Sequence, residues 1–233
     1  MAAGWITPWA IWQAALSKYI IKQEDGLGPS WEFPNRQGYV PILTNDDVYI
    51  KHVDHFNKIL AASATVIRAG EDLSAGTPIT FTISAQPDVP RNITWAFVAH
   101  AQITAYSFTI TGKDAKGATI TNTFTEADGW SGATSQAYAT VTSIIMTART
   151  GTGAGDTMNV GTGSLLGLSN NVDATGEVYK VVKSIAAGNA GDYPAASYTV
   201  AVTADTVDVS TGAAIVNGDS YTIYFKSRLY TQV

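Results

Sequence analysis

The chain has 233 residues and a mass of 24.6 kDa, a size that suits one large β domain or two smaller ones. Hydrophobic residues make up 45% of it, charged residues make up 14%, and the net charge is −5. A packed core is therefore expected, whereas a nucleic-acid binder would need a local basic patch that the sequence does not show. The absence of cysteine excludes disulfides and thiolate chemistry. No stretch approaches the roughly 18 apolar residues of a membrane helix.

The first 63 residues form an aromatic segment that is interrupted by proline and glycine. No lysine or arginine precedes its apolar part, and Gly4 and Pro8 interrupt that part, which argues against a secretory signal peptide. Residues 9–21 predict a short helix, with Thr7 as N-cap and Pro8 at the first helical position. Residues 26–41 contain three prolines and three glycines, a composition typical of an extended arm or a packed loop.

A second helix is predicted over residues 46–62. Asn45 or Asp46 can cap it, and the apolar residues Val53, Phe56 and Leu60 recur on one face. His52 and His55 would then share a helix face, with Asp54 between them. Two imidazoles and a carboxylate can bind zinc, but a catalytic zinc site takes three protein ligands, and the other histidine, His100, is expected on or beside a strand. A polar helix face is the favoured interpretation, and no metal is assigned.

After residue 78 the sequence alternates between polar and β-branched or aromatic residues, a pattern typical of strands. The segment 102–111 and the segment 118–125 predict a hairpin, with an exposed turn in which Lys113, Asp114 and Lys116 tolerate substitution. No helix-length pattern interrupts this region, which argues against a parallel βαβ sheet. The predicted strands cover residues 79–84, 92–98, 102–111, 118–125, 138–148, 156–161, 176–183, 197–203, 206–210 and 221–227.

The predicted fold class is mainly β: an antiparallel β-sandwich or barrel-like domain or domains, with an N-terminal arm and one or two short helices. Residues 1–63 are interpreted as the arm and helical segment, and residues 64–78 as a linker. Residues 79–170 form a β module, and residues 171–233 form a C-terminal β extension or a second small β domain.

Catalytic motifs are not apparent. The glycine-rich runs 151–155 and 161–163 do not lead from a strand into a helix, as a phosphate-binding loop would, and are interpreted as turn glycines. There is no Gly-x-Ser-x-Gly elbow. Acidic pairs such as Glu126 with Asp128, or Asp205 with Asp208, lie in turn-like contexts. We therefore expect a protein that is not an enzyme, with no catalytic residue, cofactor or metal.

The aromatic residues of the front segment are the candidates for partner binding, because large rigid aromatic side chains dominate protein interfaces. They either fold back onto the β domain or lie on a neighbouring subunit. The six candidates are Trp5, Trp9, Trp12, Trp31, Phe33 and Tyr39.

A family resemblance covers residues 86–168. Residues 86–94, Gln-Pro-Asp-Val-Pro-Arg-Asn-Ile-Thr, resemble an opening common among virion proteins of tailed bacteriophages. A Thr-Gly-Lys-Asp-Ala-Lys-Gly hairpin at 111–117 follows, then a Val-Thr-Ser-Ile strand at 141–144. The most distinctive part is Val-Gly-Thr-Gly-Ser-Leu-Leu-Gly-Leu at 160–168. Proteins similar in this way are head decoration or capsid-stabilising β proteins.

The resemblance implies a virion structural protein that binds the outer surface of a phage capsid and stabilises it. Its partner would be the major capsid protein, and it would form a homo-oligomer, with a trimer favoured. It would be located in the virion, assembled in the host cytoplasm, with neither nucleic acid nor membrane as a partner. The alternatives are a tail or fibre component, or a carbohydrate-binding β module used in host adsorption. The last would expose aromatic side chains, with Trp95 and Trp130 as the tryptophans available in the β region.

Overall fold

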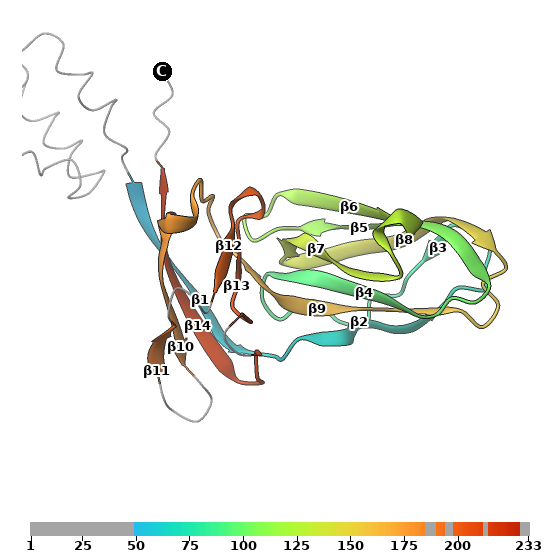
Figure 1. The fold of residues 1–233 in the computed structure, drawn as a ribbon, viewed down its shortest axis with the longest axis horizontal. Coiled ribbons are helices and arrows are strands. Elements are labelled where there is room, and N and C mark those ends of the chain that lie inside the picture. Colours follow the sequence, from blue (N-terminus) through green and yellow to red (C-terminus); the bar gives the residue numbers. More distant parts are fainter. Residues whose placement is uncertain (1–48, 185–189, 194–197, 212–213, 229–233) are drawn as a thin grey trace, which may run out of the picture. The chain divides into compact units, whose positions relative to one another are not determined.

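The computed structural model describes residues 49–184, 190–193, 198–211 and 214–228 (Figure 1). Residues 52–225 form one compact unit. The described part of the other unit is the terminal residues of the first and last strands, 49–51 and 226–228. The helix expected over residues 9–21, the arm of residues 26–41 and the six aromatic partner-binding candidates lie outside the described residues.

The described residues form antiparallel β-strands and short 3-10 turns, so the prediction of a mainly β fold is confirmed. The turns are η3 (Glu126–Asp128), η4 (Thr175–Glu177) and η6 (Val202–Ala204). The strands are β1 (Tyr49–Ile59), β2 (Ser63–Asp72), β3 (Ile79–Thr80), β4 (Arg91–Ala99), β5 (Ile103–Lys113), β6 (Thr119–Thr125), β7 (Ser131–Tyr138), β8 (Thr140–Gly151), β9 (Thr157–Gly167), β10 (Val178–Ser184), β11 (Ala190–Tyr193), β12 (Thr199–Ala201), β13 (Thr206–Asp208) and β14 (Asp219–Arg228).

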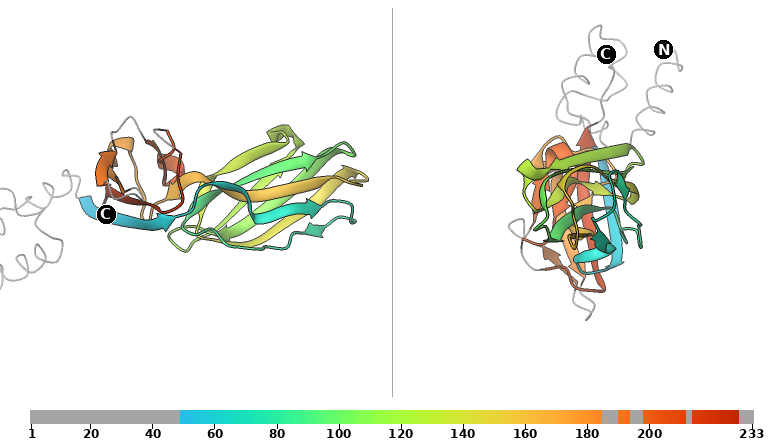
Figure 2. Two further views of the ribbon diagram at one scale, coloured as in Figure 1. Left: turned by 90° about the horizontal axis from the view of Figure 1, so that it is seen from below. Right: turned by 90° about the vertical axis from the view of Figure 1, so that its right-hand side faces the viewer.

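Two sheets pack face to face around a first hydrophobic core (Figures 1 and 2). One has the strand order β12-β13-β9-β4-β7, with β2 also paired to β9, and the other has the order β3-β8-β5-β6. Strands β5 and β6 of the second of these sheets alternate buried with less buried residues, as expected when one face of a sheet packs inward. Side chains at the centre of this core include Ile67, Ile93, Trp95, Phe108, Ile110, Met146 and Val160.

A second core lies beneath the four-stranded sheet β1-β14-β10-β11. It contains side chains from β1, β10, β13 and β14, among them Phe56, Val181, Val207, Tyr221, Ile223 and Phe225. Strand β9 contributes to both cores, because Met158 and Val160 belong to the first and Leu166 belongs to the second. A single continuous strand therefore runs from one core into the other.

The predicted helix over residues 46–62 is wrong, because residues 49–59 form strand β1. Its supposed apolar face is divided: Phe56 is 5% exposed, whereas Val53 is 44% and Leu60 is 49% exposed. Tyr49, Ile50, Val53 and Ile59 also favour a strand. Pairing with β14, distant in sequence, decides between the two possibilities. Within the described residues the helical content is limited to 3-10 turns.

Strand β2 occupies most of residues 64–78, a segment whose composition favours a linker. It pairs with β9 and places Ile67 in the first core with no exposed surface. Strand β7 was not expected either, because its sequence, SGATSQAY, lacks large aliphatic residues. In the other direction, the strand expected over residues 79–84 shortens to β3.

The glycines of β9 allow neighbouring strands to approach closely. A Cβ atom on Gly161 would overlap the backbone of Ser63 and Ala64, with Cα of Ala64 only 2.6 Å away. A Cβ atom on Gly163 would overlap the side chain of Asn92. The interpretation of Gly161 and Gly163 as turn glycines is therefore wrong, because both lie within β9 and have a packing role between β2, β4 and β9.

We predict that Gly161→Ala lowers the free energy of unfolding by about 1 to 3 kcal/mol, since the added methyl group must displace the backbone of β2. Gly76→Ala is the matched control, because its Cβ would meet nothing within 4 Å, and its effect should stay within about 0.5 kcal/mol. Urea unfolding measures both. Equal unfolding midpoints for the two variants would contradict the close approach of β2 and β9.

Candidate functional site

The connection between β1 and β2 is held by side chains from elsewhere in the chain. The backbone amide of Leu60 donates a hydrogen bond to Oδ2 of Asp88 at 2.7 Å, and that of Ala61 donates to Oδ1 of Asn217 at 2.7 Å. Leu60 also accepts a hydrogen bond from Nη1 of Arg91 at 2.8 Å. Three side chains, from two different regions, therefore fix the path of the chain where the two cores meet.

Arg91 is fully buried at the start of β4. Its Nε donates to the carbonyl oxygen of Gly163 at 2.9 Å, and its Nη1 also contacts Oδ1 of Asp88 at 3.1 Å. Among the described residues, its Nη2 has no hydrogen-bond partner. A buried charge needs hydrogen-bond or ion-pair partners, since removing the charge from water is costly. The guanidinium thus ties β4 to β9 and to the β1–β2 connection.

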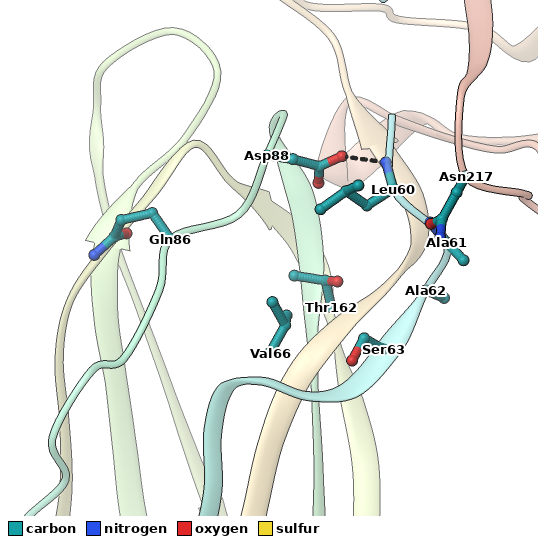
Figure 3. A pocket seen from close by; sticks show the side chains of 9 residues that line it. All are labelled: Leu60, Ala61, Ala62, Ser63, Val66, Gln86, Asp88, Thr162 and Asn217. Carbon is teal, nitrogen blue, oxygen red and sulfur yellow. Dashed lines mark hydrogen bonds between the residues drawn. The ribbon is translucent and has the colours of Figure 1, made fainter. Parts of the chain in front are cut away.

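A pocket of about 310 Å³ lies beside this junction (Figure 3). Its wall includes Leu60, Gln86, Asp88, Thr162 and Asn217. The polar side chains of the wall are largely used within the protein: the Gln86 amide, for example, donates to the carbonyl oxygen of Val141 and accepts from its backbone nitrogen. The pocket volume would suit a small ligand, but the polar side chains of its wall hold the β1–β2 connection and the neighbouring strands in place.

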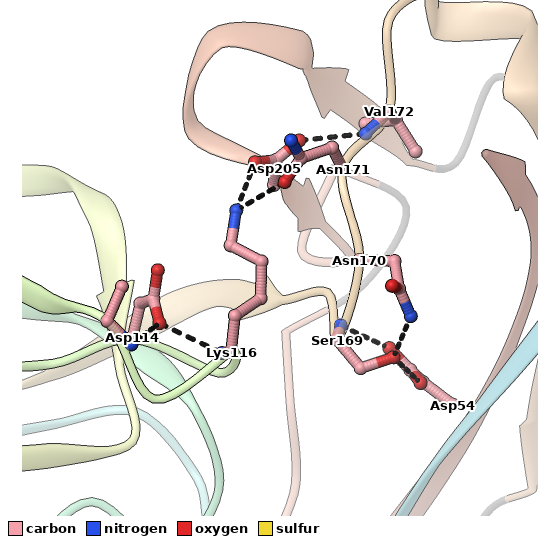
Figure 4. A network of polar contacts seen from close by, with 9 residues as sticks. Asp54, Asp114, Lys116, Ser169, Asn170, Asn171, Val172 and Asp205 are labelled. Carbon is pink, nitrogen blue, oxygen red and sulfur yellow. Dashed lines mark hydrogen bonds and ion pairs between the residues drawn. The ribbon is translucent and has the colours of Figure 1, made fainter. Parts of the chain in front are cut away.

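The turn between β5 and β6 also reaches the second core region (Figure 4). The predicted hairpin is present, and Lys113 is exposed. However, Lys116 is not a free surface residue, because its Nζ lies 2.6 Å from Oδ2 of Asp205 and 2.7 Å from Oδ1 of Asn171. The carboxylate of Asp114 accepts the backbone amides of Lys116 and Ala118. These contacts argue against tolerance at Asp114 and Lys116, whereas tolerance at the exposed Lys113 stays a prediction.

His52 and His55 do not share a face, because they lie three positions apart on a strand. The ring of His52 stacks on that of Phe225, with 5.0 Å between the ring centroids, and its Nδ1 accepts a hydrogen bond from the side chain of Asn170 at 3.1 Å. His55 instead contacts Thr222 on β14. Asp54 accepts hydrogen bonds from the backbone amide and hydroxyl of Ser169. In the described part of the chain, no group of three or more His, Asp or Glu side chains is arranged to hold a metal ion.

The first core also explains the tryptophans of the β region. Trp95 is 2% exposed and packs edge-on against Phe108, while Trp130 stacks on His100 at 4.0 Å and lies against the core. Of the exposed large apolar side chains in the described ranges, one is aromatic, Tyr179. The tryptophans therefore do not form the exposed platform that a sugar-binding face would need.

The two sheets of the sandwich end differently on their two sides. On one side the edge strands are β6 and β7, TITNTFT and SGATSQAY, which contain no charged residue and no proline. Asn122 of β6 donates to the side chains of Gln136 and Tyr138 of β7, at 3.0 and 2.6 Å, so the two edges lie together. We call this side the β6–β7 edge.

On the opposite side the edge strands are protected. Strands β3 and β12 have two and three residues. Strand β2 carries Arg68, Glu71 and Asp72 and pairs with β9 through two shifts in register. Short length, charge and irregularity are the usual devices that prevent an edge strand from pairing with another chain. Strands β6 and β7 carry no charge and have seven and eight residues, although β7 pairs with β4 through one shift in register. The β6–β7 edge is therefore the candidate interaction surface of the described residues.

Comparison with known proteins gives no match: no family model, no curated protein and no solved structure is similar to the chain at a significant level. Within the described ranges, no helix has the length and apolar character to cross a membrane.

We predict that Asp88→Ala lowers the free energy of unfolding by about 3 kcal/mol, because it leaves the buried guanidinium of Arg91 without its carboxylate. Asp88→Ala combined with Arg91→Met should be more stable than Asp88→Ala alone, since the second change removes the unpaired charge. Denaturant unfolding measures both variants. A double variant that is less stable than Asp88→Ala would show that the ion pair is not what Asp88 contributes.

We also predict that the protein loses stability as the pH falls. Burial lowers the pKa of His52 from its ordinary value of 6.5, and the charge of Asp54 acts in the opposite direction as the smaller effect. The unfolded chain then binds the proton more tightly, so stability is present above about pH 6.5 and is lost below it. His52→Gln should flatten the pH dependence of the melting temperature more than His55→Gln, its control on the other face of β1. Equal slopes would contradict this assignment.

Proposed function

We propose that the chain is a structural protein of a tailed-bacteriophage virion that binds the outer surface of the capsid and stabilises it. The observation that carries this proposal is the β6–β7 edge, two adjacent uncharged strand edges with the opposite side protected. Unprotected edges can extend a sheet by pairing with a strand of another subunit. Such pairing suits a protein that works within an assembly and forms a homo-oligomer.

The residues of the family resemblance support the same proposal through their structural roles. In the segment 86–94, the side chain of Gln86 bonds to the backbone of β8. Asp88 and Arg91 hold the β1–β2 connection and β9 in place. Asn92 accepts a hydrogen bond from the backbone amide of Leu165 at 3.0 Å. These residues therefore build a rigid scaffold. A scaffold of this kind is what a capsid-stabilising protein requires, with the major capsid protein as its partner.

The test is sedimentation of the purified full chain with emptied phage heads and, separately, with isolated tails from the phage that encodes it. We expect the chain to sediment with the heads. Sedimentation with tails alone would favour the tail or fibre alternative, and binding to neither, together with binding to host polysaccharide, would favour the adsorption module. Either result would overturn the proposal.

Two sets of variants locate the contact within the same experiment. Thr109 of β5 and Thr123 of β6 share one hydrogen bond of 3.0 Å, so Thr123→Lys and Thr109→Lys lose the same contact. Only Thr123→Lys places a charge on the edge strand, and it should weaken self-association or head binding more than its control.

Changing Trp5, Trp9, Trp12 and Trp31 singly to Ala tests the front segment, where the loss of each true interface tryptophan should cost about 2 kcal/mol or more in binding.

A further inference from the structure

Three side chains with complementary reactivity meet beside the β5–β6 turn (Figure 4). Nζ of Lys116 lies 2.7 Å from the side-chain carbonyl oxygen of Asn171 and 2.6 Å from Oδ2 of Asp205. Lys116 comes from the turn of the sandwich, Asn171 from the segment after β9, and Asp205 from the turn after η6. The cluster therefore holds a carboxamide and a carboxylate within hydrogen-bonding distance of one amine.

The protein positions each member of this cluster. The carboxylate of Asp114 accepts the backbone amide of Lys116 at 2.9 Å, which fixes the turn below the amine. Oδ1 of Asp205 accepts a hydrogen bond from the backbone amide of Val172 at 2.8 Å. The carboxylate of Asp205 therefore contacts both the amine of Lys116 and the residue after Asn171. The backbone of Asp205 has a left-handed conformation with φ of 49°, which is unusual for a non-glycine residue.

We propose that Lys116 and Asn171 form an intramolecular isopeptide bond, with Asp205 carrying the proton. The amine of lysine is a nucleophile once it has lost a proton, and an adjacent carboxylate can accept that proton. The Asn171 side chain must turn so that Cγ, in place of Oδ1, faces Nζ, and the last side-chain torsion of asparagine is broad enough for this. Contact between the two groups replaces a bimolecular encounter, which raises the rate of reaction between two weakly reactive groups.

The reaction balances without an added reagent. The Lys116 ammonium gives a proton to the Asp205 carboxylate, and the free amine forms a bond from Nζ to Cγ of Asn171. The protonated Asp205 then gives its proton to the amide nitrogen, the bond from Cγ to that nitrogen breaks, and ammonia leaves. Asp205 returns to its carboxylate form, and ammonia takes the proton that Nζ loses on forming the amide. No oxidant, reductant or water is consumed.

The bond would join two parts of the chain 55 positions apart, the turn of the sandwich and the segment that leads into the second core. It would therefore fasten the two cores covalently in a protein without disulfides. This inference concerns the chain itself and does not depend on capsid binding.

The test is the intact mass of the purified full chain, before and after incubation at about pH 9, where more of a lysine amine is unprotonated than at about pH 7. We expect the mass to fall by that of one ammonia molecule, and faster at the higher pH. Digestion should then release a branched peptide that contains both Lys116 and Asn171. A chain that keeps its full mass under both conditions would overturn the proposal.

Variants separate this bond from cyclisation of an asparagine, which also releases ammonia. Lys116→Arg should keep its full mass, because arginine cannot attack, and the neighbouring control Lys113→Arg should lose ammonia as the wild type does. Ammonia loss that persists in Lys116→Arg would overturn the proposal. Asp205→Asn should form the bond at least tenfold more slowly, as expected for the loss of a general base. An unchanged rate would exclude Asp205 as the proton carrier.

Discussion

The buried guanidinium of Arg91 is the interaction on which the arrangement of the two cores depends. It holds the carbonyl oxygens of Gly163 and Leu60 and the carboxylate of Asp88, which belong to three separate segments. A charge without exposed surface is stable only when such partners surround it. The requirement to satisfy this one side chain therefore fixes where the β1–β2 connection passes β4 and β9.

Strand β9 transmits that constraint along the molecule. Its first half lies in the first core and pairs with β2 and β4, and its second half pairs with β13 beside the second core. Gly161 and Gly163 remove the Cβ atoms that would hold the neighbouring strands apart. Lys116 and Asp205 then connect the two regions at a second point, through a turn that follows from the β5–β6 pairing. A scaffold held at two points can present the β6–β7 edge in a defined orientation within the unit.

Sequence alternation predicted the strands of the sandwich well wherever β-branched and aromatic residues alternate with polar ones, as in β5 and β6. It failed at β1, where His52-Val-Asp-His-Phe fits a helix as well as a strand, and at β7, whose small residues give no periodic signal. The sequence also gives no sign of the candidate interaction surface, the β6–β7 edge. An uncharged edge becomes visible only when the strand order shows that β6 and β7 each have one neighbour on their sheet.

The sequence by itself determined the fold class, the β5–β6 turn and the lack of cysteine chemistry, because these depend on local composition and periodicity. Arg91 lies in the segment 86–94 that carries the family resemblance, but the sequence gives no physical reason for that residue. The tertiary structure alone decided that β1 is a strand, that Arg91 is buried, and that Lys116 meets Asn171 and Asp205. Each of these depends on contacts between residues far apart in the chain, and such contacts leave no periodic trace in the sequence.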